Sequence, residues 1–205
     1  MSHCLIEPLN LLLVIFVTGV RMLEATSAFI SGWYNHARKV PSPFFNDRPD
    51  NLITALVLHN ISLPEGEFGS NHVQALFLGC LDCSLDESFA DLKGLEVSAH
   101  FYIDRQGDLL QFVSTDKRAW HAGVSSFRGK NNVNDFSIGI ELEGTDFIPY
   151  TDEQYLTLSR LARDIMLEYP IKEDAIIGHC DIAPDRKTDP GASFDWCRFR
   201  ASLKE

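Results

Sequence analysis

Positive charge is scarce in this sequence: 18 Lys and Arg residues stand against 29 Asp and Glu residues, and the net charge is −11. Proteins that bind nucleic-acid backbones carry a basic face that displaces counterions, so this balance argues against nucleic acid as a partner. It also argues against electrostatic docking on an anionic membrane. We therefore expect a partner that is neither nucleic acid nor an anionic membrane surface.

The sequence also lacks an apolar run long enough to cross a membrane. Leu9–Val20 is its most apolar stretch, and a bilayer core of about 30 Å needs about 20 such residues. No stable membrane span is therefore expected. The stretch has the length of a signal-peptide core, with Ala28 placed to close a cleavage site, so export directed by residues 1–28 is one alternative.

Charge around the stretch favours the other alternative. Glu7 precedes it, no Lys or Arg does, and Arg21 follows it, which is the reverse of the charge order in secretion signals. We expect residues 1–21 to be an apolar extension outside the native product, with Met22 as a natural start, and a cytoplasmic protein.

Cysteines are few, and their number, five, is odd. Cys80 and Cys83 form one C-x-x-C, which is half of a zinc or redox motif, and no second pair accompanies it. Reduced thiols in a cytoplasmic protein are the simplest interpretation.

The composition is that of a globular domain, with 45% hydrophobic and 11% aromatic residues. The length fits a single catalytic domain over residues 22–205. Leu52–His59, Ser137–Leu142 and Ala175–His179 are apolar runs typical of buried strands. Val40–Asp50 is rich in proline and is expected to be irregular.

Two further patterns complete the fold prediction. Ala99–Ile103 and Leu109–Val113 flank a polar, glycine-containing turn and predict a hairpin. Thr151 and Gln154 form a capping box that begins a helix, and Pro170 ends it. Because strands and helices alternate, we predict an α/β fold with a central mixed β-sheet flanked by helices.

The richest segment is His179–Asp189, which reads H-C-D-I-A-P-D-R-K-T-D. It offers a nitrogen ligand, an oxygen ligand and a cation for an anionic intermediate, which are the parts of a zinc hydrolase site. A catalytic zinc needs three protein ligands and one open position. His59 is the best candidate for the third ligand. Asp181 competes with Asp189 for the metal, and these patterns leave the choice open.

The alternative for this segment is a surface salt bridge made by Lys187 and Asp189, worth about 0–1 kcal/mol. Such a pair does not explain the proline and glycine that fix the loop.

Amide hydrolysis also needs a base that deprotonates water and returns the proton to the leaving nitrogen. Glu141 and Glu143 lie on one face of a predicted strand, opposite Ile140 and Leu142. A carboxylate in an apolar strand is costly unless it is paired or functional. Glu141 is the deeper of the two and our candidate base. The alternative is that both glutamates lie on a solvated face.

Substrate contacts are less defined by the sequence. Trp120 stands beside small residues in W-H-A-G, where it either forms the floor of a cleft for a sugar ring or belongs to the core. Asn60 and Arg186 are further candidates. A solvated pair with Asp185 is the alternative for Arg186.

Five motifs match a known family in order and spacing: Val57–Gly69, Val97–His100, Asp116–Ser125, Asn134–Asp146 and Gly178–Gly191. The chain resembles the AmpD-type anhydro-N-acetylmuramyl-L-alanine amidases. These belong to the zinc amidase group that includes phage T7 lysozyme and the peptidoglycan recognition proteins. The resemblance extends from about Gly32 to about Arg200.

The resemblance implies Zn²⁺ bound by His59, His179 and Asp189, which favours Asp189 over Asp181. It implies that Glu141 is the general base and that Lys187 stabilises the oxyanion. The implied enzyme is cytoplasmic and recycles cell wall by cutting the bond between the lactyl group of N-acetylmuramic acid and L-alanine. Its expected substrates are small anhydro-muropeptides, whose accumulation induces chromosomal β-lactamase in some bacteria.

The chain departs from the family pattern at two positions. Ala99 stands where phage-type members carry Tyr, which strengthens the assignment of Glu141. Glu96 stands where close relatives carry Arg, which predicts an altered preference for the stem peptide.

Three other functions fit parts of the pattern. One is a peptidoglycan-binding module without catalysis, which would lack part of the metal set. Another is a zinc hydrolase for an unrelated amide or ester. The third is an exported amidase that acts on intact cell wall.

Overall fold

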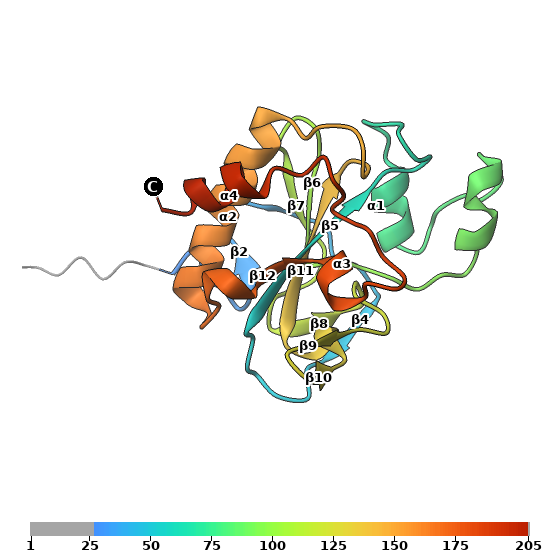
Figure 1. Cartoon of the computed structure of the whole chain (residues 1–205). Coiled ribbons are helices and arrows are strands. Elements are labelled where there is room, and N and C mark those ends of the chain that lie inside the picture. The colour runs from blue at the N-terminus through green and yellow to red at the C-terminus, as the bar shows by residue number, and fades with distance from the viewer. Residues whose placement is uncertain (1–26, 205) are drawn as a thin grey trace, which may run out of the picture.

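A computed structural model describes residues 27–204 of the chain, so the expected extension over residues 1–21 lies outside the described residues. The centre of the fold is a six-stranded sheet (Figure 1). Its strands, in spatial order, are β12 (Ile176–Gly178), β5 (Ala55–Ile61), β11 (Ser137–Glu143), β6 (Phe101–Ile103), β7 (Leu109–Gln111) and β3 (Arg38–Lys39).

The sheet is mixed, as the sequence predicts. β11 runs parallel to β5 on one side and to β6 on the other, β12 runs parallel to β5, and β3 runs parallel to β7. The antiparallel pair is β6 and β7, the predicted hairpin, and Gly107 in its turn has φ +82°. The β5–β11 register places Glu141 directly beside His59.

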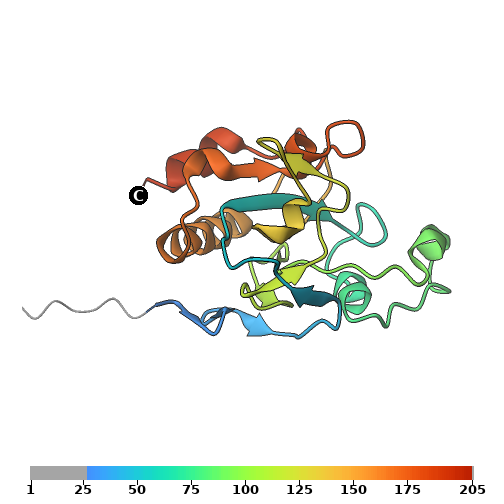
Figure 2. The same ribbon diagram turned by 90° about the horizontal axis from the view of Figure 1, so that it is seen from below.

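One face of the sheet is an apolar layer covered by α2 (Asp152–Glu168) and α4 (Trp196–Ser202). Figure 1 shows these two helices together, and Figure 2 shows the same ribbon from below. The layer is built from alternate strand residues and the apolar face of α2: Leu56, Leu58, Ile138, Ile140, Leu142, Leu158, Leu161 and Ile165. The predicted capping box begins α2, since Thr151 Oγ1 accepts from Gln154 N and Gln154 Oε1 accepts from Thr151 N, both at 3.1 Å.

The opposite face carries the polar residues of the same strands. α1 (His72–Phe77) covers part of it through Val73, Leu76 and Phe77, which pack with Tyr102 and Phe112. His59 and Glu141 occupy strand positions between Leu58, Ile140 and Leu142, whose side chains belong to the α2 layer. Strand alternation therefore separates the α2 layer from the functional face, which has two smaller apolar clusters of its own.

Several predictions are wrong in detail. The strand predicted over Leu52–His59 is β5, which begins at Ala55 and ends at Ile61. β12 ends at Gly178, and His179 is the first residue of the short helix α3 (His179–Ile182). The Asp181 carboxylate accepts from Gly178 N at 2.8 Å and so turns the strand into the helix. Val40–Asp50 is not wholly irregular either, because β4 (Phe45–Asp47) pairs with β8 (Lys117–Ala119).

The remaining elements are short. They are the strands β1 (Phe29–Ile30), β2 (Trp33–Tyr34), β9 (Ser126–Phe127) and β10 (Lys130–Asn131), and the 3₁₀ helices η1 (Glu87–Leu92), η2 (Val133–Asp135) and η3 (Glu173–Ala175). Within residues 27–204, none of the helices combines the length and the apolar character that crossing a bilayer requires.

Candidate metal centre

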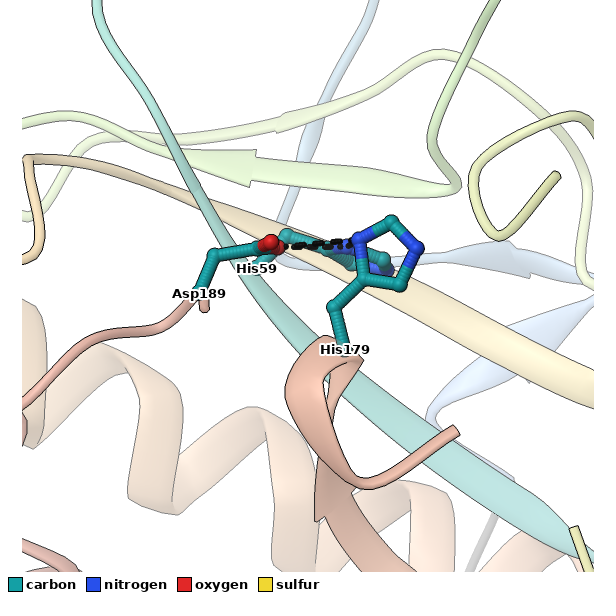
Figure 3. Close-up of side chains that lie close together, drawn as sticks. All are labelled: His59, His179 and Asp189. Carbon is teal, nitrogen blue, oxygen red and sulfur yellow. Dashed lines mark hydrogen bonds and ion pairs between the residues drawn. The ribbon is translucent and has the colours of Figure 1, made fainter. Parts of the chain in front are cut away.

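Two imidazoles and one carboxylate meet on the functional face (Figure 3). His59 comes from β5, His179 begins α3, and Asp189 lies on the loop that follows α3. The two Nδ1 atoms lie 2.9 Å apart, and Asp189 Oδ2 lies 3.1 Å from Nδ1 of His59 and 3.0 Å from Nδ1 of His179. All three residues are buried. The three ligand atoms thus form a compact triangle.

This triangle fits a tetrahedral metal. Bonds of 2.0–2.1 Å to zinc would separate its ligand atoms by about 3.3 Å, close to the observed spacing. Two imidazole nitrogens and one carboxylate oxygen are also a donor set that zinc accepts. Asp181, the competing carboxylate, is exposed and caps α3 instead. Asp189, and not Asp181, therefore lies with the two histidines.

The surroundings of the triangle favour the protonation states that metal ligands need. Burial lowers the pKa of His59 to about 4, although the adjacent Asp189 carboxylate acts in the opposite direction. Burial alone would raise the pKa of Asp189, but the adjacent His179 and His59 rings outweigh it and hold that pKa below its ordinary value. At neutral pH His59 is therefore uncharged and Asp189 is ionised, so protons do not compete with a metal there.

Glu141 lies beside the triangle, and its carboxyl group has an unusual environment. It is buried, and its Oε2 has no hydrogen-bond partner among residues 27–204. Burial raises the pKa of this carboxyl, the charge of Asp189 adds to the rise, and Lys187 opposes it. An unpaired buried carboxylate is costly for stability, so its surroundings favour a role in proton transfer.

Glu143 shares the strand face with Glu141 but not its surroundings. Its two carboxylate oxygens accept from Gly69 N at 2.6 Å and from Arg105 N at 3.0 Å. It therefore holds two loops in place. The alternative that both glutamates lie on a solvated face is wrong, because Glu143 is 2% and Glu141 8% exposed.

Two adjoining cavities open at the triangle. The first, of about 300 Å³, is lined by His59, Glu141, Lys187 and Trp120, among others. The second, of about 380 Å³, shares Asn60, Lys187 and Asp189 with it. The predicted base and cation thus line one cavity with the candidate ligands.

The three candidate substrate residues also line these cavities, and each already donates hydrogen bonds within the protein. Trp120 Nε1 donates to Asn46 Oδ1, and Asn60 Nδ2 donates to Asp146 Oδ1, both at 2.9 Å. Arg186 lines the second cavity, and its Nη2 donates to the carbonyls of Ala122 and Val124 at 3.0 and 2.8 Å.

Sequence reasoning missed His121. Its Nδ1 lies 2.9 Å from Nε2 of His59, on the side of that ring that faces away from the triangle. The signal in the sequence was slight: one imidazole in W-H-A-G, among seven histidines in the chain. Only the fold brings it to His59.

Gly139 makes room for that histidine. A Cβ atom at this position would lie 2.4 Å from Cγ of His121. We expect Gly139→Ala to displace the His121 ring and to lower the free energy of unfolding by about 1–3 kcal/mol. Denaturant unfolding measures the change, and an unchanged free energy would contradict this close contact.

A buried N,N,O triangle, a buried glutamate and a lysine on one cavity together form a candidate site for metal-dependent hydrolysis. The comparisons with known proteins identify the family. The family model for N-acetylmuramoyl-L-alanine amidase matches residues 49–192. The 1,6-anhydro-N-acetylmuramyl-L-alanine amidase AmpD of Salmonella typhimurium is 55% identical over 171 residues, which cover 83% of this chain and 91% of that relative.

Solved structures agree with this match. A crystal structure of AmpD has a TM-score of 0.83 at 53% identity and covers 85% of this chain and 98% of its own. Escherichia coli AmiD, solved with anhydro-N-acetylmuramic acid-L-Ala-D-gamma-Glu-L-Lys, has a TM-score of 0.55 at 32% identity. That match covers 73% of this chain and 57% of AmiD.

The chain belongs to the N-acetylmuramoyl-L-alanine amidase family. It is an amidohydrolase of this class, and the predictions of an enzyme and of the mixed-sheet amidase fold are confirmed.

Proposed function

We propose that this enzyme uses zinc to cleave the amide between anhydro-N-acetylmuramic acid and L-alanine in small muropeptides during peptidoglycan recycling. The observation that carries the proposal is the buried His59, His179 and Asp189 triangle beside the unpartnered oxygen of Glu141. The names of its relatives support the substrate, since AmpD is an anhydro-N-acetylmuramyl-L-alanine amidase and AmiD was solved with an anhydro-muropeptide.

His59, His179 and Asp189 would hold the metal. When bound, zinc supplies a Lewis acid that activates water and polarises the scissile carbonyl. Glu141 then takes the proton from the attacking water and returns it to the departing nitrogen of L-alanine. Its raised pKa suits this exchange, because a carboxyl that must accept and then release a proton works best with a pKa nearer to neutral.

Lys187 supplies the positive charge for the tetrahedral oxyanion. It lines both cavities, next to Asp189 and Asn60. A group that stabilises an oxyanion is typically worth roughly 3–4 kcal/mol. We expect Lys187→Ala to lower kcat by hundreds-fold and to leave the zinc content unchanged. Steady-state kinetics with an anhydro-muropeptide and metal analysis check both, and full activity would remove Lys187 from the mechanism.

The substrate contacts proposed for Asn60, Trp120 and Arg186 rest on their places along the two cavities. Trp120 offers an aromatic surface for the sugar, and Asn60 lies where the cavities meet. Arg186 keeps donors beyond the Nη2 that holds Ala122 and Val124.

The direct test is incubation with an anhydro-muropeptide, with and without a chelator, followed by mass spectrometry of the products. We expect the anhydro-sugar and the free L-alanyl peptide, and no cleavage when the metal is chelated. Stoichiometric zinc without any release of peptide would favour the peptidoglycan-binding module instead.

The proposed compartment is the cytoplasm, and the proposed catalytic domain spans residues 22–205. Within residues 27–204, Cys80, Cys83, Cys180 and Cys197 form no disulfide with one another, which suits a reducing compartment. N-terminal sequencing of protein purified from its host tests this. A chain that begins at Met1 or Met22 supports the cytoplasm, and one that begins near Ala28 supports export and action on intact cell wall.

A further inference from the structure

Two consecutive residues, His121 and Ala122, contact the Nε2 atoms of the two imidazoles in the triangle. His59 Nε2 lies 2.9 Å from Nδ1 of His121, and His179 Nε2 lies 3.1 Å from the carbonyl oxygen of Ala122. Each ligand ring therefore turns Nδ1 toward the triangle and Nε2 toward neighbouring residues of a single loop. In metal sites, such outer contacts set which nitrogen of a histidine is free to bind.

The direction of the hydrogen bonds behind His59 can be deduced. The Val133 carbonyl can only accept, so the Ser137 hydroxyl, at 2.7 Å, donates to it. The Ser137 oxygen then accepts from Nε2–H of His121, at 3.2 Å. A neutral imidazole with its proton on Nε2 carries a lone pair on Nδ1, so His121 accepts from Nε2–H of His59.

The consequence reaches the metal site. With its proton committed to His121, a neutral His59 presents the lone pair of Nδ1 to His179 and Asp189. His179 has the same tautomer. Its Nε2–H donates directly to the Ala122 carbonyl, which can only accept, so its Nδ1 also carries a lone pair.

The loop that carries His121 and Ala122 is itself held in place. Asn134 Oδ1 accepts from the backbone N–H groups of both His121 and Ala122, at 3.2 and 2.8 Å. Gly139 leaves the space that the His121 ring fills. His121 lines the catalytic cavity, but both of its ring nitrogens have partners within the protein. Its hydrogen bonds therefore serve His59 and not a substrate.

We propose that His121 is a positioning residue, which, together with Ser137, fixes the tautomer and the orientation of His59 for metal binding. This inference rests on the proposed zinc function. We call this chain of hydrogen bonds the relay: His59 donates to His121, His121 donates to Ser137, and Ser137 donates to the carbonyl of Val133.

The first test is zinc affinity, measured by competition with a chromogenic chelator on the wild-type protein and three variants. His121→Phe keeps an aromatic ring but has no acceptor for His59, and we expect about 10–100-fold weaker zinc binding. His121→Asn, whose amide oxygen can take the place of Nδ1, should recover part of the loss. Ser137→Ala, which removes the acceptor of His121, should weaken binding in the same direction.

The second test is ¹⁵N NMR of the wild-type protein loaded with zinc and labelled at histidine. We expect His121 to carry its proton on Nε2 and to show a coupling across the hydrogen bond between its Nδ1 and His59 Nε2. The Nε2 signal of His179, which is bound to Ala122, serves as the internal control and should be the same in His121→Phe.

The outcomes separate this inference from the proposed function. A wild-type protein that binds no zinc contradicts the function itself. Wild-type zinc binding with unchanged affinity in both His121→Phe and Ser137→Ala overturns the relay alone. A proton on Nδ1 of His121 in the NMR spectrum would reverse the direction of the hydrogen bonds and would also overturn the relay. This test uses the wild-type protein, so it holds even if the His121→Phe variant does not fold.

Discussion

Glu141→Gln is expected to keep its metal and to lose about 10²–10⁴-fold in kcat, the range that a general acid–base contributes. The amide cannot take a proton from water, yet it has nearly the shape of the carboxyl group. Because no described residue forms a hydrogen bond with Oε2 of Glu141, the substitution breaks no such bond at that atom within the described part of the chain. Steady-state kinetics with an anhydro-muropeptide and metal analysis of the same sample measure the two effects.

Glu143→Gln is the matched control, two residues along the same strand face. Each oxygen of Glu143 accepts from a backbone N–H, so an amide group would set a donor against a donor there. We expect it to cost about 1–3 kcal/mol of stability and to change kcat little at temperatures where the variant is folded. Loss of zinc from Glu141→Gln would instead assign Glu141 a structural role.

Removal of the metal is expected to abolish activity, and added zinc should restore it. Removal of the metal should also lower the free energy of unfolding. The three ligands come from β5, α3 and a loop, and a bound metal would link these three segments. At free zinc 1,000-fold above Kd, binding stabilises the folded state by about 4 kcal/mol. For a domain of this size that corresponds to a change in Tm of about 8–16 °C.

Thermal unfolding of the chelated and the zinc-loaded protein measures the shift, and product analysis follows the activity. Magnesium added to the chelated protein is the control, because this N,N,O site does not suit a cation that prefers six oxygen ligands. Activity that persists in metal-free protein would contradict the account.

The sequence predicts the parts of the fold that depend on local pattern. The apolar runs that become β5, β11 and β12 are buried, on the α2 side at Leu56 and Ile140 and on the opposite side at Val57 and Ile177. The capping box places the start of α2 at the correct residue. Short strands such as β4 and β8 were not predicted. Their residues include Asp47, Lys117 and Arg118, and they pair only because the fold brings them together.

The residues of the site also fall into those that a local sequence pattern predicts and those that only the fold brings together. His179, Lys187 and Asp189 are close in sequence, so their grouping has a local signature. His59 lies 120 residues from His179 and reaches it through the parallel pairing of β5 with β12. The choice of Asp189 over Asp181 came from the family resemblance and not from periodicity, because both carboxylates stand on the same short segment.

The contacts behind the ligands have no such signature. Ser137 and His121 are ordinary residues of a strand and a loop, and their roles depend on hydrogen-bond direction in the folded protein. The different states of Glu141 and Glu143 also depend on tertiary contacts. Strand alternation places both on one face. Glu143 accepts from the backbone N–H groups of Gly69 and Arg105, whereas Glu141 is influenced by the charges of Asp189 and Lys187.

The most direct test of the account is the zinc content of three purified proteins, determined by mass spectrometry: the wild type, Asp189→Ala and Asp181→Ala. Asp181 is the matched control, because its carboxylate only caps α3. We predict one zinc per chain in the wild type and in Asp181→Ala, and none in Asp189→Ala. Full zinc in Asp189→Ala, or its loss from Asp181→Ala alone, would contradict the assignment of the metal to His59, His179 and Asp189.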